Sequence, residues 1–495
     1  MKSKNIKIKY PKTLYSISAI VVLYLLLLIP LETIQVIPKS DKKPFIWNSD
    51  SVWNKLETEF INARAKGCDK IKAHVDSLFM NSEKILDEIS KVTLNPSDEK
   101  FMTLENNIFK TAPLIPACSK YFSNYVNFYS KLRKVVKEQS INWNMNSSDT
   151  RNTLYRLLYG NRTAIEEIML QLPQDKIESL INGVDEPSST SSADILGVEV
   201  HSGDILVSRG GAPTSALIAR GNDYPGNFSH IALVNINENT KAISIIESHI
   251  ERGVVVSTLD EYLKDTKLRI MVLRLRSGLI KADPMLPHKA AEFALKEAKQ
   301  KHIPYDFEMN FNESEKKFCS EVASSAYKKF GVTLWDGLST ISSIGVRNWL
   351  AAFGVKYFET EEPSDLEYDP QLSVVAEWRD PETLYKDHMD NAITDAMLEQ
   401  ADSGKVLSYN WYFLPIGRVT KFYSSIVNLF GSVGPVPEGM SAEAALKNVE
   451  YSKTHEKIKL KLIELANNFK TEIGYTPPYW DLVNLARQVR DEIDN

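Results

Sequence analysis

The feature that most constrains this chain is a run of 19 uncharged residues near its N-terminus, from Thr13 to Leu31. Five lysines precede it, at positions 2, 4, 7, 9 and 12. A helix of about 20 apolar residues spans a bilayer, and basic residues before the first span favour a cytoplasmic N-terminus. Residues 1–37 are therefore predicted to form a basic cytoplasmic tail and a single transmembrane signal anchor. The bulk of the chain is then expected outside the cytoplasmic membrane, in the periplasm or at the cell surface.

A cleaved signal peptide is the alternative for the same run. The apolar part of a signal peptide usually has about 7–15 residues and ends in small residues at the cleavage site. Here the run continues into LETIQVIPKS, which has no such site. The sequence therefore favours an anchor that is not cleaved.

The charge balance argues against nucleic acid as a partner. Lys and Arg number 59 and Asp and Glu number 64, which gives a net charge of −5. Without the five N-terminal lysines, 54 basic residues face 64 acidic ones. A nucleic-acid binder usually presents an excess of basic residues, so this class of function is not expected.

The cysteines and histidines predict neither a metal site nor a bound cofactor. Three cysteines are too few for a four-cysteine zinc module, and the eight histidines are scattered, with no H-E-x-x-H pair. Outside the cytoplasm thiols can oxidise, so Cys68 and Cys118 are candidates for a disulfide, which leaves Cys319 as a free thiol.

Changes in residue pattern divide the chain after the anchor into four parts. Residues 48–182 have apolar residues at helical spacing, which predicts a helical domain that either packs on its own core or binds a protein partner. Residues 183–195 are rich in serine and acidic residues and are expected to form a linker. Residues 196–400 mix strand and helix patterns, and residues 401–495 form a C-terminal helical extension whose main helix should end at Gly474.

The pattern of the central part predicts an α+β domain in which an antiparallel sheet packs on helices. Strands and helices do not alternate regularly there, which argues against a doubly wound parallel sheet. The expected strands cover residues 204–207, 230–236, 242–248 and 270–275, and the expected helices cover residues 214–220, 287–301 and 319–330.

An aromatic and apolar stretch follows at residues 410–435. Arg418, Lys421 and several glycines argue against a second membrane span there. The cluster at Tyr409–Phe413 (YNWYF) is expected either in a core or at a membrane interface.

Cys319 is the first candidate for a catalytic residue. It lies at the expected N-terminus of the helix over 319–330, where unpaired N–H groups and the helix dipole favour the thiolate that attacks carbonyl carbons. A free cysteine is also often a small buried apolar residue, so a packing role is the alternative.

His230 and Glu247 are expected to face each other across a hairpin. If Ile236 pairs with Lys241, His230 lies directly opposite Glu247, and opposed residues share a face of the sheet. The carboxylate could then orient the imidazole while its other nitrogen serves a nucleophile. A surface ion pair without function is the alternative, and His249 is a rival partner for His230.

Five short motifs, in this order along the chain, resemble the permuted papain-like amidases of the YaeF/YiiX type, which are related to NlpC-like cysteine peptidases. They are GDIL at 203–206, FSHIALV at 228–234, IES at 246–248 with GV at 253–254, PYDF at 304–307 and FCSEV at 318–322. The resemblance covers roughly residues 196–400 and is less clear after residue 335. In these proteins the histidine precedes the cysteine, the reverse of papain.

The resemblance implies a circularly permuted papain-like domain between the two helical regions. It implies that Cys319 is the nucleophile, His230 the base and Glu247 the third polar residue, with Tyr305 steadying the oxyanion beside the Cys319 backbone N–H. The chain departs from the family at Lys301-His302, where a glycine is expected before the Pro-Tyr pair.

Resemblance and expected location together predict a membrane-anchored cysteine hydrolase that cleaves amide bonds through a thioester, with peptidoglycan peptides as the leading substrate class. Two alternatives are open. The same Cys–His site occurs in lipid acyltransferases related to lecithin:retinol acyltransferase, which would make the substrate a lipid or a thioester. The third hypothesis is a non-catalytic envelope scaffold whose helical regions bind an unidentified protein.

Overall fold

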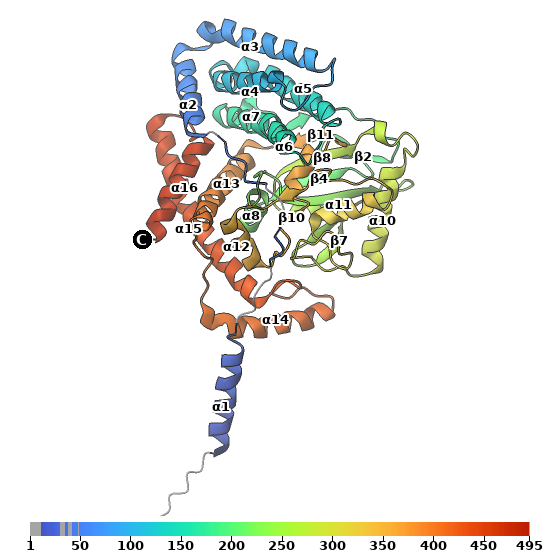
Figure 1. Ribbon diagram of the computed structural model, residues 1–495, viewed down its shortest axis with the longest axis vertical. Coiled ribbons are helices and arrows are strands. Elements are labelled where there is room, and N and C mark those ends of the chain that lie inside the picture. The colour runs from blue at the N-terminus through green and yellow to red at the C-terminus, as the bar shows by residue number, and fades with distance from the viewer. Residues whose placement is uncertain (1–10, 30–34, 38–41, 48, 495) are drawn as a thin grey trace, which may run out of the picture.

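The computed structural model describes residues 11–29, 35–37, 42–47 and 49–494 (Figure 1). Its α-helices are α1 (Pro11–Leu26), α2 (Ser49–Lys66), α3 (Cys68–Ile89), α4 (Glu99–Thr111), α5 (Phe122–Ser140), α6 (Ser148–Leu154), α7 (Gly160–Gln171), α8 (Pro213–Arg220), α9 (Leu259–Lys264), α10 (Leu286–Gln300), α11 (Cys319–Lys328), α12 (Ile344–Phe353), α13 (Pro381–Asp402), α14 (Leu414–Leu429), α15 (Ala442–Ile473) and α16 (Tyr479–Asp494). Its strands are β1 (Leu180–Asn182), β2 (Ser192–Ile195), β3 (Val198–His201), β4 (Ile205–Gly210), β5 (His230–Ile236), β6 (Ile243–His249), β7 (Gly253–Ser257), β8 (Lys267–Leu275), β9 (Ser339–Thr340), β10 (Glu359–Thr360) and β11 (Leu372–Trp378).

The N-terminal helix α1 projects away from the body of the molecule (Figure 1). It has 16 residues, fewer than the uncharged run that predicted it. Within the parts of the chain that the structure describes, no helix combines the length and the apolar character needed to cross a membrane. The expected transmembrane helix is therefore not confirmed, and the expected tail at 1–10 and part of the expected anchor, residues 30–34, lie outside the described residues.

The helices between residues 49 and 171 form a layer at the top of the view in Figure 1. Their apolar faces meet in one core, where Val75, Leu104 and Leu132 are fully buried. The candidate disulfide is confirmed, because Cys68 at the start of α3 is bonded to Cys118 in the 3-10 segment η1 (Ala112–Tyr121).

Seven strands form one antiparallel sheet, in the order β1-β11-β8-β4-β5-β6-β7. Side chains alternate between the faces of β5. Ile231 and Leu233 enter the core shared with α10 and α11, whereas Ala232 and Val234 enter the core on the other face. The combination of helices with an antiparallel sheet confirms the α+β class, and each expected element of the central part is present, with ends shifted by up to three residues.

The predicted register of the β5–β6 hairpin is wrong by two residues. Ile236 pairs with Ile243 rather than Lys241, and Glu247 lies opposite Ala232 rather than His230. The turn is longer than expected because Lys241 adopts a left-handed conformation, with φ of 58°, inside it. A shift of two residues preserves the face of every side chain. His230 and Glu247 therefore remain on one face as diagonal neighbours.

Part of the segment expected as a linker is fixed to the sheet. β1 pairs with β11, so the region expected to be helical ends in a strand. The N–H groups of Gly183 and Val184 continue this pairing by donating to carbonyls of β11. Glu186 is buried and accepts a hydrogen bond from Ser373. These partners are almost 190 residues away, so the local composition did not indicate them.

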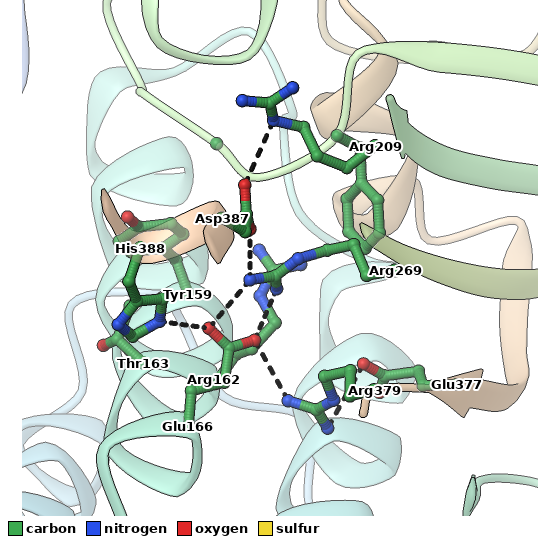
Figure 2. Close-up of polar contacts among 12 residues, drawn as sticks. Tyr159, Arg162, Thr163, Glu166, Arg209, Arg269, Glu377, Arg379, Asp387 and His388 are labelled. Carbon is green, nitrogen blue, oxygen red and sulfur yellow. Dashed lines mark hydrogen bonds and ion pairs between the residues drawn. The ribbon is translucent and has the colours of Figure 1, made fainter. Parts of the chain in front are cut away.

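A cluster of buried charges joins the helical layer, the sheet and α13 (Figure 2). Glu166 of α7 accepts hydrogen bonds from Arg269 of β8 at 2.5 and 3.2 Å, and lies 3.3 Å from Nε2 of His388 on α13. Asp387, also on α13, lies 2.5 Å from Arg269 and 3.1 Å from Arg209 of β4. Burial raises the pKa of Glu166, but Arg269 and the hydrogen bond with His388 outweigh it and hold the pKa well below its usual range. The carboxylate therefore stays ionised and links the three regions.

The C-terminal helices pack on the central domain through a third core. α12, α13, α15 and α16 meet there, and Ile393, Leu462 and Leu482 are fully buried. α15 ends, as expected, at Gly474, whose φ of 84° allows it to cap the helix. α14 packs on the first part of α15 and lies across the end of the body from which α1 projects (Figure 1).

Candidate active site

Cys319 is the first residue of α11, and only 4% of its surface is exposed. Val322 and Ala323 hold this helix against the sheet in a shared core. The sulfur lies 3.9 Å from the carbonyl oxygen of Ser229, which directly precedes His230. The N-terminus of α11 thus meets the N-terminal end of β5, which brings Cys319 into contact with Ser229, 90 positions earlier in the chain.

Burial changes the expected charge state of this thiol. The helix N-terminus was expected to favour the thiolate, and hydrogen bonding from the backbone of Ile231 and Ser320 does act in that direction. Burial outweighs it and, together with the carboxylate of Glu362, raises the pKa of Cys319 to about 12. The resting thiol is therefore neutral, and a base must remove its proton before the sulfur can attack.

His230 and His249 hold Glu247 between them. Nε2 of His230 lies 2.8 Å from Oε2 of Glu247, and Nε2 of His249 lies 3.1 Å from Oε1. The hydroxyl of Ser257 on β7 donates to Oε1 at 2.9 Å. Because Glu247 holds Nε2 of His230, Nδ1 is the nitrogen that can accept a proton from a thiol. His249 lies beside the other oxygen of the same carboxylate, and Glu247 remains the partner of His230.

The charges within this group follow from burial and pairing. Burial raises the pKa of Glu247, but the hydrogen bonds and charges of the two imidazoles outweigh it and hold the pKa well below its usual range. Burial also lowers the pKa of His230, although Glu247 acts in the opposite direction. At neutral pH the site therefore combines an ionised carboxylate, a neutral imidazole and a neutral thiol.

His230, Glu247 and His249 are also residue types that can bind a metal ion. The candidate ligand atoms of His230, Glu247 and His249 lie within 4.8 Å of one another, and two histidines with one carboxylate form a common zinc ligand set. In this structure Nε2 of His230 forms a hydrogen bond with the carboxylate, whereas Nε2 of His249 lies 3.1 Å from Oε1 but forms no well-aligned hydrogen bond. The hydrogen bonds with His230 and Ser257 account for both oxygens of the buried Glu247 without an ion.

A cleft of about 900 Å³ contains these residues. Cys319, His230, Glu247 and Tyr305 all line it. Burial raises the pKa of the Tyr305 phenol well above its usual range, and the proximity of Cys319 adds to this effect. The cleft therefore unites all four residues that the sequence singled out. Charged side chains of both signs also line it, namely Glu251, Arg252, Glu261, Lys264, Asp265 and Lys267.

One wall of the cleft was not expected from the sequence. Pro437, Met440 and Asn448 of the C-terminal extension line it. Gly439 of the same segment packs so closely that a Cβ there would lie 2.6 Å from the ring of Phe307. No local motif marks these residues, because their role depends on a contact between segments more than 100 residues apart.

Comparison with protein families agrees with this geometry. A model described as the permuted papain-like amidases of the YaeF/YiiX type, family C92, matches residues 199–376. Residues 199–376 are therefore similar to that family. The match includes His230, Glu247, Tyr305 and Cys319 and ends before α13. Because the family comprises papain-like cysteine amidases, the permuted domain is a hydrolase domain. Comparisons with curated proteins and with solved structures give no match.

Proposed function

We propose that the chain is a cysteine amidase in which Cys319 is the nucleophile, His230 the base and Glu247 the residue that orients His230. The observation that supports this most strongly is the cleft shared by the buried thiol and the His230–Glu247 pair. A neutral imidazole beside a neutral thiol is suited to general-base activation of the nucleophile.

The proposed reaction has two steps. Cys319 gives its proton to Nδ1 of His230 as the sulfur attacks the amide carbonyl carbon. His230 returns this proton to the nitrogen as the C–N bond breaks, which releases an amine and leaves a thioester on Cys319. Water then loses a proton to His230 and attacks the thioester. As the C–S bond breaks, His230 gives this proton to the sulfur, which releases a carboxylic acid and restores the thiol. Glu247 stabilises the imidazolium that forms in each step.

Tyr305 and the backbone N–H of Cys319 are proposed to stabilise the oxyanion. The first N–H groups of a helix have no acceptor within the helix, so that of Cys319 is suited to bind the developing charge. Tyr305 keeps its phenolic proton because its pKa is raised, and it can donate a hydrogen bond from the same cleft.

The proposed substrates are cell-wall peptides outside the cytoplasmic membrane. The charged residues of both signs along the cleft suit a peptide that carries free carboxylate and amino groups. The proposed location rests on the N-terminal apolar segment, where the large side chains of α1 between Tyr15 and Leu26 are exposed. Such a segment suits attachment to a membrane, with the hydrolase domain on the outer side.

Mass spectrometry of purified sacculi incubated with the full-length chain tests this proposal. Wild type should release peptide fragments with new amine and carboxylate ends, and Cys319→Ala and His230→Ala should not. His74→Ala changes an exposed histidine of the helical layer and is the matched control, which should act like wild type. Undiminished cleavage by Cys319→Ala would overturn the proposal.

A lipid or thioester substrate is the second candidate. The segment that follows the apolar helix α14 lines the cleft, which suits a substrate that comes from a membrane. Phospholipid vesicles incubated in parallel distinguish the two. Fatty acid release that depends on Cys319, without cleavage of sacculi, would favour the lipid substrate. If wild type shows neither activity, the result would favour a non-catalytic scaffold.

A further inference from the structure

α14 and the residues beside it expose a continuous apolar surface. Phe422 is 68%, Leu429 84% and Phe430 83% exposed. Their neighbours on this surface are also large and exposed, namely Trp411, Tyr412, Phe413, Ile416, Val419, Tyr423 and Ile426. Positions 416, 419, 423, 426 and 430 recur at helical spacing, so they form one stripe along the helix.

The charged residues of this segment are turned away from the stripe. Arg418 and Lys421 are the only charged residues between Lys405 and Glu438. Arg418 donates to the carbonyl of Ile29, and Lys421 donates to the carbonyl of Pro437 at 2.6 Å and to that of Glu438. A large exposed patch without charge is unusual in a protein surrounded by water and marks an interaction surface.

The apolar surface of α14 continues onto α1. The hydroxyl of Tyr24 on α1 donates to the carbonyl of Tyr412 at 2.9 Å, and Arg418 binds the end of the apolar segment at Ile29. α1 exposes large apolar side chains at consecutive positions from 20 to 26, so no single side of it is polar. In Figure 1, α14 lies across the end of the body at the base of α1.

We propose that α14 lies flat in the surface of a lipid bilayer, with its stripe among the acyl chains. A helix with a wide apolar face binds membranes in this way, and Trp and Tyr are enriched at the boundary between lipid and water. A bilayer fits better than a second copy of the chain, because a flat protein surface would not cover residues 20–26 of α1, where apolar side chains are exposed on every side of the helix. This contact goes beyond the amidase reaction and does not depend on Cys319.

The proposed contact between α14 and the bilayer fixes the orientation of the cleft relative to the membrane. Pro435 and Pro437, in the loop between α14 and α15, line the cleft. Ala445, Asn448 and Val449 in the first turns of α15 line it as well. With α14 in the bilayer surface, this wall of the cleft stays close to the lipid head groups. Attachment through α1 alone would not set this orientation.

Quenching by brominated lipids tests the proposal on the full-length chain. The background is Cys319→Ala, in which the two remaining cysteines form the disulfide. A fluorescent label is placed on Phe422→Cys or, as the matched control, on Leu460→Cys. Leu460 is 69% exposed, nearly the same as Phe422, but it lies on α15 about 27 Å along the helix from Ala442. The labelled chains are incorporated into phosphatidylcholine and phosphatidylglycerol vesicles with or without bromine on the acyl chains.

The label at 422 should be quenched several-fold by bromine while the label at 460 is unaffected, and Leu429→Glu with Phe430→Glu should abolish quenching at 422. Equal, weak quenching at both positions would overturn the proposal, as would a disulfide between the unlabelled Phe422→Cys residues of two chains. Flotation of the vesicles reports attachment separately, and a chain that does not float also contradicts the proposal. Because Cys319 is absent throughout, the outcome is independent of the proposed hydrolysis.

Discussion

Replacement of Glu247 by glutamine tests the role of the buried carboxylate. Glutamine has nearly the same shape, but it carries no charge to stabilise a protonated His230. The hydrogen bond between His230 and Glu247 is 2.8 Å long, and Glu247 is only 1% exposed. A hydrogen bond to a charged group contributes about 1.5–3 kcal/mol. Since about 1.4 kcal/mol corresponds to a factor of ten in rate, Glu247→Gln should slow His230-dependent deprotonation of Cys319 by about 10- to 150-fold.

The rate at which iodoacetamide alkylates Cys319 at pH 7 measures this effect without a known substrate. Ser257→Ala is the matched control, because it removes a hydrogen bond to Oε1 of Glu247 and leaves the bond to His230 in place. It should slow alkylation by less than tenfold. Unfolding curves establish that both variants are folded. A folded Glu247→Gln chain that is alkylated at the wild-type rate would refute the assigned role of Glu247.

Three further predictions follow from the same structure. Burial lowers the pKa of His230, so this base is already neutral at about pH 6.5, the ordinary pKa of histidine. The alkylation rate should therefore hold steady between about pH 6.5 and 7.5 and fall only at lower pH. A decline in rate that starts above about pH 7 would contradict this. Glu166→Gln leaves the buried Arg269 short of its carboxylate and should lower the free energy of unfolding by about 3–5 kcal/mol in urea titrations, while Glu382→Gln, in an exposed pair with Lys386, should change it by less than about 0.5 kcal/mol. The proposed reaction uses no metal, so dialysis against a chelator should leave both alkylation and hydrolysis unchanged; loss of activity that zinc restores would instead favour metal binding by His230, Glu247 and His249.

Local patterns predicted the elements that carry the site. Alternation along β5 and the apolar face of α11 are properties of contiguous residues, so the sequence was sufficient to locate both. The pairing of His230 with Glu247 was also predicted on the correct face. Its register was wrong because the left-handed conformation of Lys241 lengthens the turn, and no glycine or asparagine at that position indicated it.

Long-range packing determines what the sequence could not reveal. The thiol of Cys319 is neutral because segments distant in the chain bury it, and the local helix N-terminus alone pointed to the opposite charge state. The cleft wall formed by Pro437 and Met440 depends in the same way on contacts across more than 100 residues. The strand pairing of β1 and the buried contact of Glu186 also have distant partners, which a serine-rich composition cannot indicate.

The most direct measurement of the central claim compares alkylation of Cys319 by iodoacetamide at pH 7 in wild type, His230→Ala and the double variant His230→Ala/Glu247→Gln. If His230 is the base, its removal should slow alkylation by about 100-fold or more. If Glu247 acts only through His230, the double variant should be no slower than His230→Ala alone. Alkylation of His230→Ala at the wild-type rate would contradict the account.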